Sequence, residues 1–401
     1  MRRRKVVTAQ EHAALALTEI VLVGGGHSHV EVVRRFGLAP ESGLRLTMIC
    51  TDALTPYSGM LPGYVAGHYA ADDIHIDLAR LADWAGVRFV RDEVVAIDRK
   101  GRTVRCASGL EMRYDHLSLN IGSAPRMGDV AAADSLVVPV KPIRNFRNRW
   151  LDLRQRVCTH SESTKTIAVV GGGAGGVELL LAMQHRLRQD IRGSGRHAEQ
   201  LRFHLFTRGA QILPTHGARV RDRFMRELAA RGVTLHLGAD VCRVSDGRLE
   251  TRKGLRVEAD EIVWVTQAGG ARWLRDTGLA LDSDGFVQVD DSLRSVSDDR
   301  IFAAGDVASL VSRPLAKAGV FAVRQGPILA ENLRRAALGQ PLVRYRPQRR
   351  WLALITTGDR YAVASWGPVG VAGHWVWRWK DAIDRRFMAR YRDLPPRRAA
   401  D

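Results

Sequence analysis

Two glycine-rich turns are the residues of this chain whose spacing most directly implies chemistry. They lie 147 residues apart and read Gly24-Gly25-Gly26-His27-Ser28-His29 and Gly171-Gly172-Gly173-Ala174-Gly175-Gly176. Glycine lets the backbone turn sharply and approach a pyrophosphate, which then rests on the N–H groups and positive end of the following helix. Each turn follows a short apolar run, a context typical of dinucleotide binding. Two such turns predict two nucleotides and electron transfer between them.

The two turns are unequal. The second fits the Gly-x-Gly-x-x-Gly pattern through Gly171, Gly173 and Gly176, whereas the first has His29 in place of the third glycine. That glycine normally permits close packing of helix on strand, so we expect the first helix to sit slightly farther from its sheet. A metal role for His27 and His29 is disfavoured, because residues two apart at a helix start point to different faces.

The residues after the next strand of each unit bear on the ribose. An acidic residue is expected there, about 20 residues past the turn. In the first unit Asp52 comes two places late, and in the second the strand ends in Thr207-Arg208 with no acid. The missing carboxylate removes repulsion of a 2′-phosphate, and Arg208 could pair with one. This favours NADPH over NADH; the alternative is a solvated arginine at a strand end.

The elements that must position these turns form two similar units and predict an α/β fold. The pattern predicts two Rossmann-like dinucleotide-binding domains, the second inserted in the first, followed by a C-terminal tail region. The expected strands are Val21–Val23, Leu44–Ile49, Arg88–Asp98, Ile167–Val170, Leu201–Thr207, Val233–Leu237, Glu261–Val265 and Phe302–Ala308. The expected helices are Val30–Phe36 and Gly176–Leu187, with a hairpin over Gly101–Leu119 and a surface loop over Arg188–Gln200.

Composition bounds the class of protein. The chain has 401 residues, enough for two domains and a tail, and no apolar run approaches the ~18–20 residues of a spanning helix. The basic start lacks the apolar run of a signal peptide, so we expect a cytoplasmic protein.

The four cysteines are scattered without a Cys-x-x-Cys pair, which indicates neither a dithiol relay nor a metal site. The formal charge of +18 is accompanied by no nucleic-acid recognition motif, and we expect no nucleic acid partner.

Several longer segments resemble flavoproteins with two dinucleotide domains. The stretch from Tyr114 to Ser123 resembles their return to the FAD domain, and Ile301–Asp306 resembles their C-terminal FAD motif. A narrower likeness lies in 55–63, 141–143, 317–326 and 377–380. These segments resemble the pyridine nucleotide-disulfide oxidoreductase-like branch often fused to selenide, water dikinase, which is similar to type II NADH dehydrogenases and sulfide:quinone oxidoreductases.

The resemblance implies FAD in the first domain, NADPH or NADH in the second, and hydride transfer between the two cofactors. It implies cofactor contacts at Gly24, Gly25, Gly26, His27, Ser28, Asp52, Tyr57, Pro62, Gly122, Gly305, Asp306, Gly171, Gly173, Gly176, Thr207 and Arg208. Lys317 is expected to steady negative charge on the reduced flavin or quinone, or else to pair with a surface carboxylate. Glu178 is expected near the nicotinamide, or else as a first-turn carboxylate that complements the helix dipole.

The electron acceptor and the tail leave alternatives open. Thr356 and Thr357 stand where a sulfide:quinone oxidoreductase would keep a thiol, so thiol-relay chemistry is disfavoured and a quinone or similar small acceptor is expected. In the tail, Trp375, Trp379, Ile383, Phe387 and Tyr391 recur every four residues. This stripe predicts either an interfacial helix, which would place the protein peripherally on the inner face of a membrane, or a helix packed on the protein itself.

We therefore interpret the chain as an FAD-dependent NAD(P)H oxidoreductase. The alternatives are redox handling of selenium or sulfur species linked to selenophosphate supply, and a flavoprotein redox partner or sensor without turnover. The predicted organisation is a basic N-terminal extension (1–18), an FAD-binding domain (19–125 and 285–337), an NAD(P)-binding domain (126–284) and a C-terminal interface or membrane-contact region (338–401).

Overall fold

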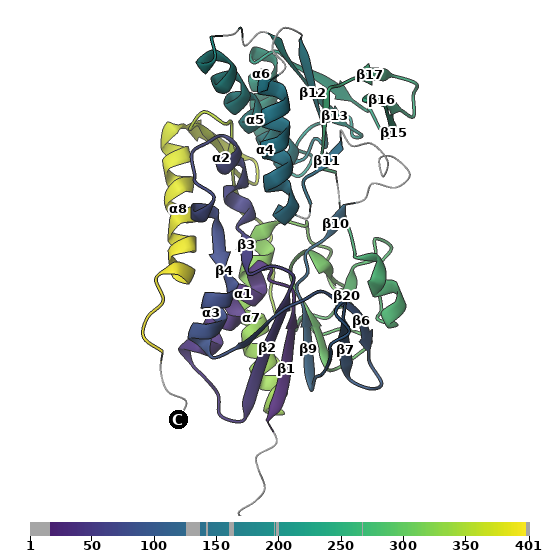
Figure 1. The fold of residues 1–401 in the computed structure, drawn as a ribbon, viewed down its shortest axis with the longest axis vertical. Helices are drawn as coiled ribbons and strands as arrows, with labels where there is room; N and C mark the ends of the chain where they lie inside the picture. Colours follow the sequence, from purple (N-terminus) through teal and green to yellow (C-terminus); the bar gives the residue numbers. More distant parts are fainter. Residues whose placement is uncertain are drawn as a thin grey trace, which may run out of the picture.

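A computed structural model of the chain describes residues 17–125, 137–141, 143–159, 164–195, 197, 200–266 and 268–397. Two five-stranded parallel sheets form the centres of two domains, one above the other in Figure 1. The second sheet is built by a stretch of chain that lies between strands of the first. The predicted α/β class with two Rossmann-like units, one inserted in the other, is therefore confirmed.

The first sheet has the order β21-β9-β1-β2-β5. The last residue of β1, Val23, pairs with Ile49 on one side and with Leu119 on the other, so the first glycine turn leaves the sheet between two neighbouring strands. Ligands of such sheets bind in the crevice at this point, where the strand order reverses. Its strands are β1 (Thr18–Val23), β2 (Leu44–Cys50), β5 (Arg88–Arg91), β9 (His116–Leu119) and β21 (Ile301–Ala303).

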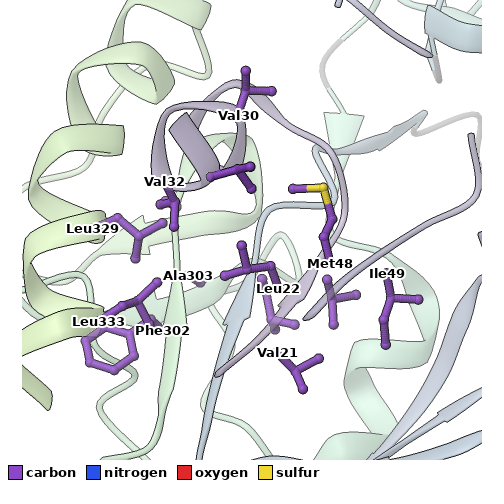
Figure 2. Close-up of a cluster of buried hydrophobic side chains, with 14 of the residues drawn as sticks. Val21, Leu22, Val30, Val32, Met48, Ile49, Phe302, Ala303, Leu329 and Leu333 are labelled. Atoms are coloured by element: carbon purple, nitrogen blue, oxygen red, sulfur yellow. The ribbon is translucent and has the colours of Figure 1, made fainter. Parts of the chain in front are cut away.

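Part of the core of the first domain lies between this sheet and two helices, α1 (His27–Leu38) and α7 (Gly319–Ala337). Figure 2 shows Val30 and Val32 of α1, and Leu329 and Leu333 of α7, over the strand residues Leu22 and Phe302. All six are fully buried. Because burying an aliphatic side chain contributes about 1.5–3 kcal/mol, this contact fixes the position of α1, and with it the glycine turn.

The second sheet repeats the arrangement of the first in the order β11-β18-β12-β13-β14. The second glycine turn again follows the strand with neighbours on both sides, here β12. The strands are β11 (Val137–Pro139), β12 (Lys165–Val170), β13 (Leu201–Thr207), β14 (Val233–Leu237) and β18 (Glu261–Trp264), with helices α4 (Ile143–Thr159), α5 (Ala174–Gly193) and α6 (Ala218–Ala230).

The C-terminal region consists of an antiparallel sheet and one long helix, α8 (His374–Arg392), drawn in yellow along the left side of Figure 1. Its strands are β23 (Leu352–Thr356), β24 (Ala362–Trp366) and β25 (Val369–Gly373). The smaller elements are α2 (Leu61–Val65), α3 (Leu78–Ala85), β3 (Leu54–Pro56), β4 (His75–Asp77), β6 (Val94–Asp98), β7 (Thr103–Cys106), β8 (Glu111–Arg113), β10 (Ala124–Pro125), β15 (Val241–Ser245), β16 (Arg248–Thr251), β17 (Arg256–Glu258), β19 (Ala268–Gly269), β20 (Val287–Val289) and β22 (Ala308–Leu310).

Four predicted elements differ from the structure. The single strand over Arg88–Asp98 is two strands in different sheets, and the hairpin over Gly101–Leu119 contains only β7 and β8, because β9 joins the parallel sheet. The predicted loop over Arg188–Gln200 was wrong in its first part, since α5 continues to Gly193 and buries Ile191. The strand over Phe302–Ala308 breaks at Gly305, whose φ of +72° does not fit a strand.

The proposed return of the chain from the second domain to the first lies earlier than the predicted boundary at 285, close to η4 (Arg272–Thr277). Leu274 and Leu279 fall within the range predicted for the second domain, yet both pack into the core of the first. We therefore propose that the chain re-enters the first domain before 274 and not at 285.

Candidate functional site

The first glycine turn is shaped by a close approach to Asn120. Gly24 has a φ of +93°, and a Cβ placed on it would lie 2.6 Å from the Asn120 carbonyl oxygen. A Cβ on Gly26 would collide with the Asn120 side chain. Any larger residue at either position would therefore push the turn away from the end of β9.

Asn120 is the residue that joins the first turn to the second half of its domain. Its Oδ1 accepts the backbone N–H groups of Ser28 (3.1 Å) and His29 (3.2 Å), and its Nδ2 donates to the Ala304 carbonyl at 2.6 Å. It is 2% exposed, so these bonds form away from water. We did not single it out as a site residue from the sequence, although an asparagine directly after an apolar strand was a usable signal.

His29, in the place of the third glycine, is fully buried and hydrogen-bonded on both ring nitrogens. Nδ1 lies 2.7 Å from the Gly24 carbonyl oxygen, and Nε2 lies 2.8 Å from the Ser118 hydroxyl on β9. Burial lowers the pKa of His29 from 6.5 to about 4, although the bond to Gly24 opposes the shift. The neutral imidazole thus ties the turn to the sheet where glycine would simply allow close packing.

Ser28 and His27 face different surroundings. Ser28 is fully buried, its N–H is taken by Asn120 and its hydroxyl donates to the Ala322 carbonyl at 2.7 Å. Both donors are thus used inside the protein, and a contact between Ser28 and a cofactor stays a prediction. The buried Nε2 of His27 has no partner among the described residues, and desolvation lowers its pKa to about 4. An unpartnered buried nitrogen in a glycine turn fits a ligand contact.

Asp306 follows Gly305 and is held by the side chains of Ser123 and Lys141. The Lys141 ammonium and the Ser123 hydroxyl contact its Oδ2 at 2.7 and 3.0 Å. Burial alone would raise the pKa of Asp306, but the Lys141 charge and these hydrogen bonds keep it below its usual value. The carboxylate is therefore ionised and pre-positioned. Gly122, two residues after Asn120, has nothing within 4 Å of an added Cβ, which leaves open space at this end of β9.

Lys317 stands over an aromatic ring and interacts electrostatically with Asp306. Its Nζ donates to the Ala308 carbonyl at 2.6 Å and stands 3.8 Å from the centre of the Phe286 ring. Burial away from water lowers the pKa of Lys317, and the negative charge of Asp306 opposes this shift. The two predicted site residues Lys317 and Asp306 thus share one electrostatic environment.

The second turn has the geometry of the full glycine pattern. Gly171 has a φ of +135°, and a Cβ on it would lie 2.6 Å from the Val265 carbonyl oxygen. A Cβ on Gly176 would collide with the Gly171 carbonyl, so only glycine allows α5 to begin this close to β12. Gly173, the N-cap of α5, carries no side-chain cap and has nothing within 4 Å of an added Cβ. This helix start is open to an anion.

The predicted ribose-side residues lie at the carboxyl ends of β2 and β13. Thr207 is 9% exposed and lies against the second turn, since a Cβ on Gly172 would be 2.7 Å from its hydroxyl oxygen. Arg208 follows it and is exposed. Asp52 is half-buried and its Oδ2 accepts from the Thr51 hydroxyl at 3.3 Å.

Glu178 contacts the C-terminal region. The interpretation as a first-turn carboxylate was wrong, because α5 begins at Ala174 and has no acid in its first turn. The Glu178 Oε1 accepts from the backbone N–H of Thr356 at 2.7 Å and from the Thr356 hydroxyl at 3.1 Å. Burial raises the pKa of Glu178, and the nearby Lys380 charge partly offsets the shift.

The loop that carries Tyr57 and Pro62 is held by α8. Lys380 donates to the Gly59 carbonyl at 2.7 Å and pairs with Asp384, which also accepts from the Tyr57 hydroxyl. The Tyr57 ring stacks on Phe387 with centroids 4.3 Å apart, and Pro62 is buried in the first turn of α2. The sequence did not indicate Lys380 and Asp384 as a buried pair, although their i, i+4 spacing was the available signal.

Two parallel sheets, each with a glycine turn at its switch point, define a two-domain dinucleotide-binding protein. The family described as pyridine nucleotide-disulphide oxidoreductase matches residues 18–332. The chain belongs to this family, as the sequence predicts.

Two curated relatives whose sequences are similar to this chain have names that refer to NADH. An NADH dehydrogenase-like protein of Mycobacterium tuberculosis is 30% identical over 260 residues, which cover 60% of this chain and 61% of that protein. The chain thus matches less than two thirds of that relative's length. A type II NADH:quinone oxidoreductase of Haemophilus influenzae is 25% identical over 336 residues and 74% of each chain.

Solved structures share the fold over nearly the whole chain. The sulfide:quinone oxidoreductase of Aquifex aeolicus superposes with a TM-score of 0.78 at 16% identity and covers 94% of this chain and 92% of that chain. NDH2 of Plasmodium falciparum in complex with NADH superposes with a TM-score of 0.75 at 12% identity, covering 95% and 100%. At these identities the likeness establishes the fold alone.

Proposed function

We propose that this protein is an FAD-dependent oxidoreductase that takes a hydride from NAD(P)H and passes electrons to a quinone or similar small acceptor. The observation that carries the proposal is the pair of glycine turns, one at the switch point of each parallel sheet. The family membership supports FAD and NAD(P)H as the cofactors. The names of relatives such as the Haemophilus type II NADH:quinone oxidoreductase support the acceptor class.

The residues around the first turn fit FAD. Gly24 and Gly26 permit a close backbone approach, and the space at Gly122 is open. The His27 Nε2, which has no partner among the residues that the structure describes, offers a hydrogen-bonding atom. Asp306 would bind the ribityl hydroxyls with a carboxylate kept ionised by Lys141. When bound, FAD supplies the capacity to accept a hydride and release electrons. Gly25, Asp52, Tyr57 and Pro62 stay predicted contacts.

The protein's own charges would support that chemistry. Lys317 is a cation close to Asp306 in a partly desolvated position, where it is suited to stabilise negative charge that develops during reduction. Glu178 and Thr356 form a hydrogen-bonded junction between the start of α5 and the C-terminal sheet. Gly171, Gly173 and Gly176 would position the nicotinamide nucleotide on the start of α5.

The acceptor class is supported by the cysteines as well. Cys50, Cys106, Cys158 and Cys242 form no Cys-x-x-Cys pair in the sequence, and Thr356 and Thr357 bond to Glu178 and Asp359. This spacing favours a small acceptor over a thiol relay. The selenium or sulfur alternative and the sensor alternative stay predictions.

The test is anaerobic reduction of the purified protein followed by turnover. We expect a yellow protein whose flavin absorbance bleaches on mixing with NADPH or NADH, and steady oxidation of the nucleotide when a soluble quinone is added. Disulfide and selenite serve as control acceptors. A colourless preparation would overturn the proposal, and bleaching without quinone turnover would overturn its acceptor.

We also propose that the C-terminal region contacts an anionic membrane surface. No helix in the described part of the chain is long and apolar enough to cross a membrane. Three side chains of the predicted stripe are nevertheless exposed: Trp375 (56%), Trp379 (41%) and Ile383 (40%). Trp366, Val369 and Val371 of the adjoining strands are exposed as well, and Arg350 stacks over Trp366. Tryptophan combined with arginine suits a lipid interface.

A further inference from the structure

The carboxyl end of β13 lacks the group that recognises an unphosphorylated adenosine ribose. A carboxylate there normally accepts hydrogen bonds from the ribose hydroxyls and repels a 2′-phosphate. Here the position is held by Thr207, whose neutral hydroxyl lies against the second glycine turn. A hydroxyl can donate to a phosphate oxygen, which a carboxylate cannot do.

Two cations lie at this edge of the sheet, and they belong to different elements. Arg208 follows Thr207 directly, and the Gly209 carbonyl accepts the Gly238 N–H at 2.9 Å, which joins the ends of β13 and β14. A Cβ placed on Gly238 would lie 3.8 Å from the Lys253 Nζ, so the hairpin between β16 and β17 brings Lys253 to the same edge. Both cations are exposed, and neither side chain has a hydrogen bond or ion pair within the described part of the chain.

The nearby acid does not cancel this charge. Asp240 lies two residues past Gly238, but its Oδ2 is bound by the Arg252 Nε at 2.9 Å. Thr207 lies against the glycine turn at an open helix start that suits a pyrophosphate, and Arg208 and Lys253 add two cations at the same edge of the sheet. Charge-assisted bonds from arginine and lysine to phosphate are among the strong hydrogen bonds of proteins.

We propose that Arg208 and Lys253, together with the Thr207 hydroxyl, bind the 2′-phosphate of NADPH and make NADPH the preferred hydride donor. This inference rests on the proposed function, because it selects the nucleotide that the same site uses. It separates the chain from the relatives above, whose names specify NADH.

The direct test is binding of 2′,5′-ADP and 5′-ADP to the purified full chain by titration calorimetry, which needs no turnover. We expect 2′,5′-ADP to bind at least about tenfold more tightly than 5′-ADP, and Arg208→Ala and Lys253→Ala each to remove most of that difference. Arg202→Ala is the matched control, since Arg202 is an exposed arginine at the opposite end of the same strand. Equal binding of the two probes, or an equal loss in the control, would overturn the proposal.

A second variant tests the preference in the opposite direction. Thr207→Glu with Arg208→Ala should invert the ratio of kcat/KM for NADPH to that for NADH, while the flavin still bleaches with NADH. Flavin reduction by NADH and NADPH at equal rates in the unchanged protein would overturn the preference but leave the proposed function intact. Failure of both nucleotides to reduce the flavin would instead overturn the proposed function.

Discussion

His29 shows how one residue can replace a glycine in a nucleotide-binding turn. Its Nδ1 donates to the Gly24 carbonyl and its Nε2 contacts the Ser118 hydroxyl, while burial away from water favours the neutral imidazole. The pKa of His29 in the folded protein is about 4, below its ordinary value of 6.5. Between these values the unfolded chain binds more protons, so the stabilisation is complete above about pH 6.5 and is lost as the pH falls toward 4.

We therefore expect His29→Asn to make stability less dependent on pH. Lowering the pKa of His29 from 6.5 to about 4 corresponds to roughly 3 kcal/mol of unfolding free energy. The wild type should lose this stability between about pH 7 and pH 4. His27 has a similarly lowered pKa, so only the difference between variant and wild type belongs to His29. Chemical denaturation at several pH values measures it, and parallel curves for the two proteins would contradict the assignment.

At the scale of elements, the sequence predicts regular units better than the segments that join them. The two strands that precede the glycine turns, β1 and β12, were predictable from the sequence. Short apolar runs followed by glycine have few other interpretations. The stripe on α8 was only half informative. Its C-terminal members Phe387 and Tyr391 are buried on the first domain, whereas Trp375 and Trp379 are exposed. Periodicity gives a face, but the partner of that face depends on contacts with Tyr57 and Glu31, which lie over 300 residues away.

The buried pair of α8 should hold the Tyr57 loop in place. Asp384→Ala removes the partner of Lys380 and leaves a cation that is only 8% exposed, which we expect to lower the unfolding free energy by about 3–5 kcal/mol. Replacing both residues, with Lys380→Met and Asp384→Leu, should recover part of this loss, because Lys380 is no longer left as an unpaired buried cation, although Glu178 then loses a nearby positive charge. Asp393→Ala, at the exposed end of the same helix, is the control and should leave stability nearly unchanged. Equal losses in the single and double variants would show that packing, not charge, sets the cost.

At the scale of the whole molecule, the C-terminal region connects both domains and presents its remaining apolar side chains outward. Glu178 ties β23 to the second domain, and Tyr391 bonds Glu31 of the first at 3.1 Å. The end of the helix is fixed further, since Arg80 and Trp84 donate to the carbonyls of Arg392 and Pro395. A truncation at Gly373 would therefore damage the first domain's core as well as any lipid contact.

Point substitutions on the exposed face separate these effects. We expect the triple change Trp375→Ser, Trp379→Ser and Ile383→Ser to abolish co-sedimentation with vesicles that contain phosphatidylglycerol, because it removes the apolar anchor but leaves Phe387 and Tyr391 in place. Leu110→Ser, Leu255→Ser and Val311→Ser change exposed apolar residues elsewhere and should retain vesicle binding. Binding of the wild type should also weaken as salt rises, since arginines contribute by attraction to anionic lipid. If the variant with all three serine substitutions at 375, 379 and 383 still binds vesicles, the lipid contact lies elsewhere. If the wild type binds neutral phosphatidylcholine vesicles equally well, an anionic surface is excluded as the partner.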